Sequence, residues 1–347
     1  VPVAGGAAET VLDVGALAAQ FDCPSVHAAV PSPDERFLAH TVDERGNERF
    51  AVRLKDLTTG RCRGLGDAVT TGTVVWNAGS THLFHVARDA HGRAATLVAA
   101  PIDGSEPLVI LRAPDPTRRI DIRRSADASH LIVHLGDYGS AEVFIVDLAS
   151  LPFHPRPLLP ARADVVWDVE ISGGEVFLRH DALEPNGFTL SRFGLGAPFD
   201  PTETLVAPSP GAVLIAMAVR RRHLLWVEVE RLRQRLGVLD RSSGAQRLFE
   251  LPSSYTTVTL NENGRHDTDR FALELSSLAQ PRRGFVLDAG RGDLAPIEPE
   301  PDPSSPYVTE TIYVAAPDGA SIPVSLVWHP ERRVAGPAPC LLAGYGA

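Results

Sequence analysis

Hydrophobic and polar positions along the chain follow one repeated pattern: a polar turn, a short apolar strand, a second turn and another strand. The pattern occurs six times, and its copies align on Phe37, Leu83, Leu131, Val176, Leu224 and Phe271. The intervals between these residues are 46, 48, 45, 48 and 47 positions. A period in the forties with about four short strands per repeat is typical of β-propeller blades. An unrepeated β-sandwich is the alternative, but it would make five near-equal intervals accidental.

A second strand follows within several repeats, as in residues 50–57, 141–148 and 236–240. These segments alternate β-branched and polar residues and end at turns rich in Gly, Asp and Ser, which favours antiparallel strands over helices. The sequence therefore predicts an all-β fold, with propeller blades over residues 21–295.

The pattern changes after residue 295. Residues 296–306 carry five prolines among acidic residues and serines, which predicts an extended linker. Two apolar segments, 311–316 and 320–328, flank a Pro-Asp-Gly turn and predict a hairpin. A last apolar strand is predicted over residues 339–343, just before Gly344-Tyr345-Gly346.

Charge and composition exclude several functional classes. The 347 residues carry a net charge of -10 and a single lysine, Lys55, which argues against nucleic-acid binding. No apolar run approaches the roughly 18 residues that span a bilayer, so we expect no membrane partner. The first residue is Val1, and no signal peptide is visible; the missing Met suggests that the natural N-terminus lies upstream.

The cysteines and histidines predict neither a disulfide framework nor a metal site. Cys23, Cys62 and Cys340 are odd in number and far apart, and we interpret them as free thiols of a reducing compartment. His82 and His85 would point to opposite faces of a strand, and His130 and His134 would lie about 13 Å apart. Neither pair suits zinc, so no cofactor is expected.

Several charged groups have a structural and a functional interpretation. The arginines at 118–119, 123–124 and 220–222 are expected to be solvated strand edges, although they could meet acidic peptide groups. Arg291-Gly292-Asp293 is expected to be a turn. Four acidic residues could line a propeller channel and attract cationic peptides, with nothing to fix their direction: Asp115, Asp121, Asp164 and Asp168.

The closing segments, taken with the repeats, resemble the prolyl oligopeptidase family of serine peptidases. Residues 316–327, with Pro317-Asp318-Gly319, look like the entry of that family into its α/β-hydrolase domain, and Gly344-Tyr345-Gly346 looks like its tyrosine-glycine turn. The segments 53–60, 73–76, 255–258 and 275–281 are similar to the oligopeptidase B branch. The chain departs from the pattern at Ala343 and Ala347.

The resemblance implies seven blades, of which six full ones are visible. Residues 1–20 would be the end of a truncated first blade, and residues 307–347 would be the first strands of a truncated hydrolase domain. The domain would pack against the propeller, and the chain would be a fragment of a longer protein.

Serine hydrolysis on that scaffold needs a Gly-x-Ser-x-Gly elbow, which occurs nowhere in these residues. The resemblance assigns one catalytic role in this chain: the Tyr345 hydroxyl would donate to the oxyanion. Asp318, Ser325 and His329 are close in sequence but lie on one predicted hairpin, so they are not expected to form a triad.

The parent protein is therefore expected to be a cytoplasmic serine-type endopeptidase that cleaves short peptides after Arg or Lys, with the propeller controlling access. The isolated chain is expected to be inactive. Two alternatives stay open: a proline-specific oligopeptidase of the same family, and a non-catalytic propeller that acts as an interaction scaffold.

Overall fold

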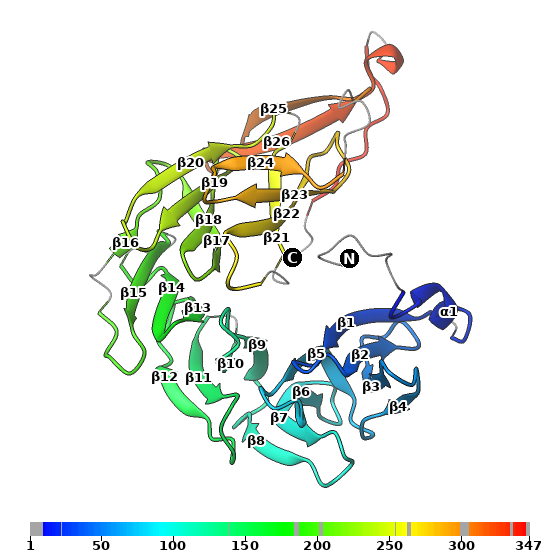
Figure 1. The fold of residues 1–347 in the computed structure, drawn as a ribbon. Helices are drawn as coiled ribbons and strands as arrows, with labels where there is room; N and C mark the ends of the chain where they lie inside the picture. Colours follow the sequence, from blue (N-terminus) through cyan, green and yellow to red (C-terminus); the bar gives the residue numbers. More distant parts are fainter. Residues whose placement is uncertain are drawn as a thin grey trace. The chain divides into compact units, whose positions relative to one another are not determined.

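The repeated turns and strands fold into six sets of four antiparallel strands in a computed structural model (Figure 1). It describes residues 10–21, 23–137, 139–183, 187–200, 204–253, 255–261, 265–298, 305–333 and 336–344. The first two sets are joined in one eight-stranded sheet, and each of the other four is a separate four-stranded sheet. Each of the six residues used to align the repeats lies in the second strand of its set. The predicted propeller repeat is confirmed, because four strands form for every copy of the pattern.

The chain divides into two compact units, residues 1–206 and 207–347. The first unit holds a short helix, one eight-stranded sheet and two four-stranded sheets. Consecutive strands pair within the four-stranded sheets, whereas in the eight-stranded sheet the third strand pairs with both the fourth and the fifth and so joins the first two repeats. Its elements are α1 (Val14–Ala18), β1 (Ser25–Pro31), β2 (Phe37–Asp43), β3 (Phe50–Asp56), β4 (Cys62–Gly64), β5 (Thr70–Trp76), β6 (His82–Arg88), β7 (Ala94–Pro101), β8 (Leu108–Arg112), β9 (Arg119–Arg124), β10 (His130–Gly136), β11 (Ala141–Asp147), β12 (Arg156–Leu159), β13 (Trp167–Ser172), β14 (Glu175–His180), β15 (Thr189–Gly194) and β16 (Thr204–Val206).

The second unit holds two four-stranded sheets and a separate hairpin. Its elements are β17 (Val213–Val219), β18 (His223–Glu230), β19 (Arg233–Asp240), β20 (Gln246–Glu250), β21 (Thr257–Leu260), β22 (Arg270–Ser276), β23 (Arg283–Asp288), β24 (Asp293–Pro296), β25 (Val308–Ala315), β26 (Ser321–Trp328) and the 3-10 turn η1 (Pro330–Arg332).

Apolar side chains between neighbouring sheets make the core, because each sheet has two faces to bury. Within the first unit, Phe84, Leu97, Ile120 and Leu131 belong to a buried cluster drawn from the second and third repeats. Within the second unit, a corresponding cluster joins residues of β18 and β19 to residues of β22 and β23. The middle strands are the most completely buried, which explains why the hydrophobic pattern of the second strand was the clearest repeat in the sequence.

The recurring polar turn before the second strand also links one repeat to the next. The Asp34 backbone N–H donates to the Ser80 hydroxyl at 3.1 Å, and the Gly173 N–H donates to the Asp127 carboxylate at 2.8 Å. In each pair the partners are 46 residues apart, which is one repeat. These polar residues therefore connect the turn to the equivalent turn of a neighbouring blade.

The start and the end of the chain differ from the six repeats. In the predicted remnant of a first blade, residues 14–18 form helix α1, capped by the Asp13 carboxylate, which accepts from the Ala16 N–H at 2.9 Å. The predicted hairpin near the other end is confirmed as β25 and β26. Residues 299–304 of the proline-rich linker lie outside the described residues.

The strand predicted over residues 339–343 does not form. Leu341 and Leu342 are 93% and 85% exposed, and a strand is stable only when its backbone groups pair with a neighbour. An apolar sequence alone therefore does not make a strand here.

Candidate functional site

The residue to which the sequence assigns a catalytic role, Tyr345, lies outside the described residues. The structure gives the position of its predecessors only up to Gly344. Its proposed contact with an oxyanion therefore stays a prediction.

Asp318, Ser325 and His329 do not come together. Asp318 lies in the turn before Ser321 and accepts from the Ala320 N–H at 3.0 Å, whereas His329 follows the far end of β26. Eight residues of extended strand separate the two ends, or about 26 Å. His329 packs instead against Tyr307, with ring centroids 5.8 Å apart. The expectation that these residues form no triad agrees with this geometry.

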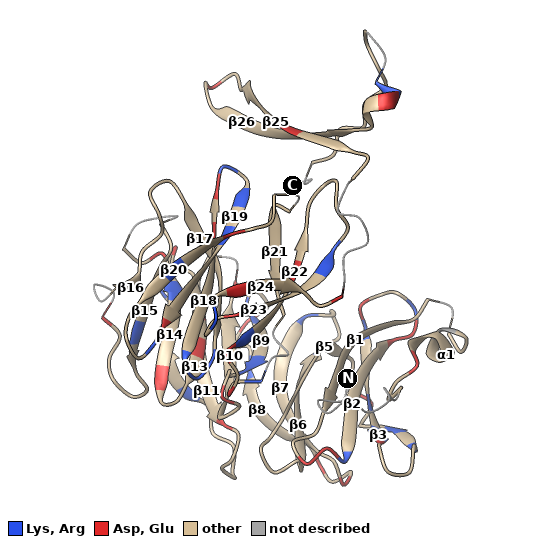
Figure 2. Cartoon of the chain, turned by 45° about the horizontal axis from the view of Figure 1, so that its top comes forward, with Lys and Arg blue, Asp and Glu red and all other residues tan. Residues whose placement is uncertain are grey.

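A charged network joins β9 and β13, the first strands of two sheets in the first unit. Figure 2 labels both strands and colours the charged positions along the chain. Arg123 on β9 contacts Asp168 at 3.0 Å and Glu170 at 3.4 Å, and both carboxylates lie on β13. Asp168 also contacts Arg179 on β14 at 3.3 Å. Glu170 accepts hydrogen bonds from the Ala126 and Ile171 N–H groups, each at 2.8 Å. Two guanidinium groups thus meet two carboxylates in a partly buried, electrically balanced site.

The environments of the two carboxylates shift their pKa values in opposite directions. Burial alone would raise the pKa of Asp168, but the adjacent Arg123 and Arg179 outweigh it and lower the pKa. Burial is the stronger effect at Glu170 and raises its pKa, in spite of Arg123. Asp168 is already paired with two cations, so it is not available to attract cationic peptides along a channel.

The arginines predicted as solvated edges are in part buried and paired, so that expectation was wrong for two of them. Arg123 is held in the network above, and Arg220 is 4% exposed, with its guanidinium 5.0 Å from the Phe271 ring centroid. Both arginines lie at or near the end of the first strand of a blade and contact residues of the next blade. Their positions in the sequence do not reveal which residues of that blade they contact.

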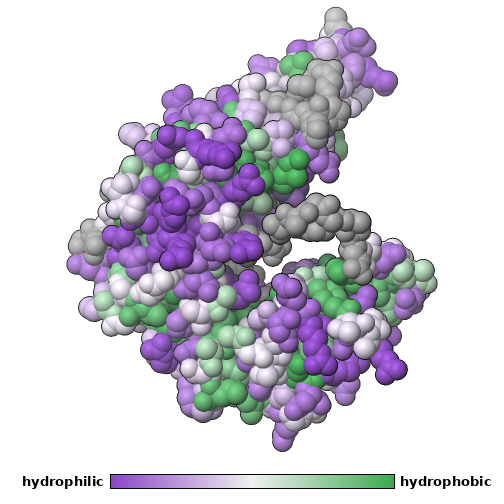
Figure 3. Space-filling model, viewed as in Figure 1, coloured by the Kyte–Doolittle hydropathy of each residue, from purple (hydrophilic) through white to green (hydrophobic). Residues whose placement is uncertain are grey.

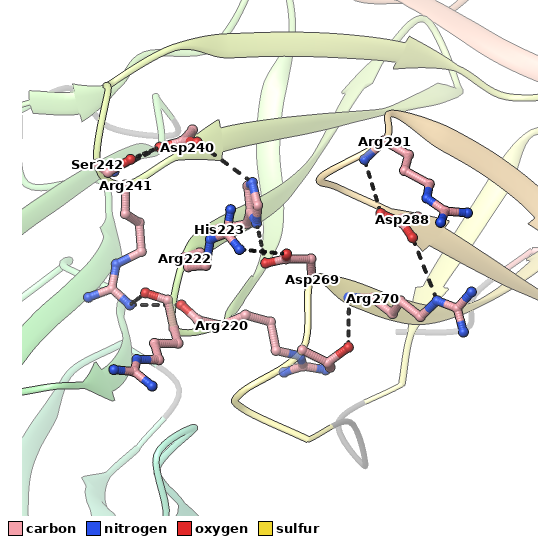
Figure 4. A network of polar contacts seen from close by, with 12 residues as sticks. Arg220, Arg222, His223, Asp240, Arg241, Ser242, Asp269, Arg270, Asp288 and Arg291 are labelled. Atoms are coloured by element: carbon pink, nitrogen blue, oxygen red, sulfur yellow. Dashed lines mark hydrogen bonds and ion pairs between the residues drawn. The ribbon is translucent and has the colours of Figure 1, made fainter. Parts of the chain in front are cut away.

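In the second unit, a buried histidine joins two sheets (Figure 4). His223 on β18 is 4% exposed, and its Nδ1 lies 2.9 Å from the Asp269 carboxylate, before β22. Arg222 reaches the same carboxylate at 3.2 Å. On its other side, His223 lies 3.9 Å from Asp240, which accepts from the Ser242 hydroxyl at 2.6 Å. The arrangement is a bridge between blades, again across 46 residues.

His82 and His85, one of the pairs considered for zinc, lie in different environments. His85 is 2% exposed, neither ring nitrogen has a partner, and burial lowers its pKa to about 4, so the ring is neutral near pH 7. His82 instead contacts the Thr81 hydroxyl at 2.9 Å. Within the described ranges, no group of three or more His, Cys, Asp or Glu side chains is arranged to hold a metal ion.

Other sequence predictions can be placed as well. Cys23, Cys62 and Cys340 are all exposed, and none is bonded to another. Arg291 and Gly292 lie in the turn between β23 and β24, which confirms the turn assigned to that tripeptide. The part of the chain that the structure describes has no helix long and apolar enough to cross a membrane.

A cavity in the second unit was not foreseen from the sequence. Its volume is about 320 Å³, and its walls are formed by Ala207, Pro208, Ser209, Trp226, Glu228, Gln246, Arg247 and Leu248. The only signal in the sequence is that Trp226 and Glu228 alternate with apolar residues, so both lie on one face of β18. A buried carboxylate and an indole on one face of a strand give this cavity polar groups that a ligand can contact.

Comparison with known proteins places the chain in a family. Residues 1–300 match the family described as "Prolyl oligopeptidase, N-terminal beta-propeller domain". The chain belongs to the prolyl oligopeptidase family. The matched range covers all six repeats, from β1 to β24, so the repeats seen in the sequence are the blades of that propeller domain.

Two curated relatives are each 26% identical to this chain over 98% of its length. They are "Dipeptidyl aminopeptidase BI" from Pseudoxanthomonas mexicana and "Protease 2" from Moraxella lacunata. The chain spans about half the length of these relatives, 48% and 50% respectively. The structure of oligopeptidase B from Leishmania major superposes with a TM-score of 0.85 at 23% identity, over 95% of this chain and 49% of that one. This structural likeness shows the shared fold.

Proposed function

We propose that the chain is the substrate-gating propeller, with the first strands of the catalytic domain, of a serine-type endopeptidase that hydrolyses short peptides after Arg or Lys. The observation that carries the proposal is the match of residues 1–300 to the propeller domain of a peptidase family. The peptidase names of the two curated relatives support it.

The proposed domain organisation follows the changes in sequence pattern along the chain. Residues 1–20 end a first blade, residues 21–295 form the other blades, residues 296–306 are a linker, and residues 307–347 begin an α/β-hydrolase domain. In this arrangement the blades restrict access to the active site, so that only short or unfolded peptides reach it.

The hairpin β25–β26 supports a further domain after the propeller. It pairs with no other described strand, and Tyr313, Val314, Ile322 and Val327 are 45–54% exposed. Apolar side chains of this size gain about 1.5–3 kcal/mol each when they are fully buried. A hydrolase sheet that continues from this hairpin would cover them.

The proposed chemistry is acyl transfer to a serine that the 347 residues do not supply in an elbow motif. The serine oxygen would attack the peptide carbonyl carbon while a base of the further domain took the serine proton, and the resulting oxyanion would accept a hydrogen bond from the Tyr345 hydroxyl. The C–N bond of the peptide would then break, with the same proton passing to the amine that leaves. A single donor of this kind typically contributes about 2.7–4 kcal/mol to stabilisation of the transition state.

The decisive test compares the 347-residue chain with a protein extended by the coding sequence after Ala347. The extended protein should hydrolyse an N-acylated arginine amide, and a serine-directed inhibitor should abolish the reaction. The chain alone should show no turnover. Inhibitor-sensitive turnover by the chain alone would overturn the assignment of roles.

A matched substrate panel separates the alternatives. Faster cleavage of an N-acylated proline amide would identify a proline-specific enzyme. Cleavage that requires a free N-terminus two residues before the bond would indicate removal of dipeptides, as the name of one relative suggests. No cleavage by the extended protein would favour a binding propeller. Cell fractionation tests the proposed cytoplasmic location.

A further inference from the structure

Four turns lie at one end of the two four-stranded sheets of the second unit. They connect β17 to β18, β19 to β20, β21 to β22 and β23 to β24. Since neighbouring strands of an antiparallel sheet run in opposite directions, the two turns of each sheet lie at the same end of it. The turns of the two sheets meet there, because the Arg221 N–H donates to the His266 carbonyl at 2.9 Å. We call the described residues 220–222, 241–245, 265–269 and 289–292 the basic turns.

Charge distinguishes the basic turns from the corresponding turns of the first unit. Between the four pairs of strands named above, the sequence carries a net charge of +3, from six arginines and three acidic residues. Between the corresponding strands of the first unit the net charge is -5, from two arginines and seven acidic residues. The whole chain has a net charge of -10, so the basic turns reverse its sign locally. The six arginines are Arg220, Arg221, Arg222, Arg241, Arg265 and Arg291.

Two of these arginines have no carboxylate partner. Arg222 lies 3.2 Å from Asp269, a carboxylate that it shares with His223 (Figure 4). Arg221 and Arg291 are exposed, and within the described part of the chain no carboxylate lies within 4.0 Å of either guanidinium group. The surface over β19 and β20, the strands that flank one basic turn, is largely hydrophilic (Figure 3). An exposed guanidinium presents several donors in a plane, which suits the two oxygens of a carboxylate.

The basic turns lie at the opposite end of their sheets from the continuation of the chain. β24 begins at the last basic turn, with Asp293, and ends with Pro296 at the other end of its sheet. The chain therefore continues toward the hairpin β25–β26 from that other end. A further domain that extends the hairpin does not need the basic turns, which leaves them accessible to a separate partner.

We propose that the basic turns bind an acidic segment of a polypeptide. Aspartate or glutamate side chains of the segment pair with the guanidinium groups of Arg221 and Arg291, which no carboxylate of the described chain neutralises. A nucleic acid is the less favourable partner, because its continuous negative charge is repelled by a chain with a net charge of -10. A short acidic segment contacts only the basic surface. The site has no part in bond cleavage after Arg or Lys, so it goes beyond the proposed peptidase function.

The test measures binding to the whole 347-residue chain and needs no turnover. The probes are two acetylated peptide amides of equal length, one of alternating Glu and Gly and one of alternating Gln and Gly. At low ionic strength, titration calorimetry should show the Glu peptide binding at least tenfold more tightly. Physiological salt should remove most of that difference, because charges at the surface are screened. Since catalysis is not measured, failure of this test leaves the proposed function untouched, and the reverse also holds.

A matched pair of double variants assigns the binding to the basic turns. Arg221→Gln with Arg291→Gln should weaken binding of the Glu peptide at least fivefold and leave the Gln peptide unaffected. The control is Arg36→Gln with Arg61→Gln, which changes the net charge equally. Arg36 precedes a second strand, as Arg221 does, and Arg61 lies between a third and a fourth strand, as Arg291 does. The control should bind the Glu peptide within twofold of the unaltered chain.

Three results would overturn the proposal. One is equal affinity for the Glu and Gln peptides at low ionic strength, or no binding of either. Another is the same affinity for the Glu peptide in the two double variants, with circular dichroism showing that both are folded. The third is tighter binding of a single-stranded thymidine oligonucleotide than of the Glu peptide at the same ionic strength, which would assign the basic turns to nucleic acid.

Discussion

Gly237 is the position where the smallest change should disturb both the packing and the cavity. It lies in β19, opposite Trp226, in an ordinary strand conformation that alanine also adopts. A Cβ atom added there would lie 1.9 Å from Cε2 and 2.1 Å from Cζ2 of the Trp226 ring. Contacts below 3.0 Å are not tolerated, so the indole would have to move by more than an ångström.

The expected cost follows from two opposing effects. Overpacking a closely packed site costs about 1–3 kcal/mol. Replacing glycine by alanine in a compatible conformation restricts the unfolded chain and returns about 0.4–1 kcal/mol. Gly237→Ala should therefore lower the free energy of unfolding by about 1–2 kcal/mol. For domains of this size that corresponds to a decrease in Tm of about 2–8 °C.

Thermal unfolding followed by circular dichroism measures the effect, and Gly64→Ala is the matched control. Gly64, at the end of β4, is likewise a strand glycine without positive φ, but nothing lies within 4 Å of the Cβ that it would gain. The control should keep its Tm or gain slightly. In a Trp226→Ala background, Gly237→Ala should cost less than it does in the unaltered chain, because the ring that the new methyl group meets is gone.

The explanation would be refuted if Gly237→Ala and Gly64→Ala had the same Tm. It would also fail if Trp226→Ala and Gly237→Ala were simply additive, since the loss would then not come from their contact.

Three further predictions concern charged and titratable side chains. Arg123→Ala should lower the free energy of unfolding by about 2–3 kcal/mol, because it leaves the partly buried Glu170 without a cation and Asp168 with Arg179 alone. Arg124→Ala, exposed on the same strand, should change it by less than about 0.5 kcal/mol, and urea unfolding compares the two. The pKa of His85 is about 4 in the folded chain, against 6.5 for a free histidine. The free energy of unfolding should therefore fall by about 3 kcal/mol as the pH is lowered from 6.5 to 4. In His85→Leu, unfolding measured over the same pH range should lack this decrease. Asp269→Ala should lower the free energy of unfolding by about 1–2 kcal/mol, because His223 is then left buried without this partner. Asp267→Ala removes an exposed ion pair and should lower it by less than about 1 kcal/mol. Equal losses of stability in thermal unfolding would contradict this explanation.

The repeat could be read from the sequence because it depends on short-range chemistry. A polar turn followed by a buried strand is determined within about ten residues, as at Ser32–Ala39 or Ser125–Val133, and the period adds independent copies of the same signal. The hairpin β25–β26 was equally accessible, since Pro317-Asp318-Gly319 sets its turn.

The contacts between blades could not be read in the same way. Arg123 looked like a solvated edge because its partners, Asp168 and Glu170, lie a whole repeat away. The cavity was missed because the space beside Trp226 depends on Gly237, which pairs with it only once the sheet has formed. The strand expected over 339–343 failed for a related reason: its neighbours cannot be deduced from its own residues.

The hydrogen bonds between equivalent turns have a consequence for how the molecule changes over evolutionary time. Asp34 with Ser80, Asp127 with Gly173, and His223 with Asp269 are each one repeat apart. An insertion on the solvent side of a blade leaves both turns of such a pair in place, whereas a shift of one residue within a second strand moves a turn away from its partner. The lengths of the loops between the outer strands can therefore change, whereas the position of each turn relative to its partner one repeat away has to be kept. The blades should tolerate new loops far better than slipped strands.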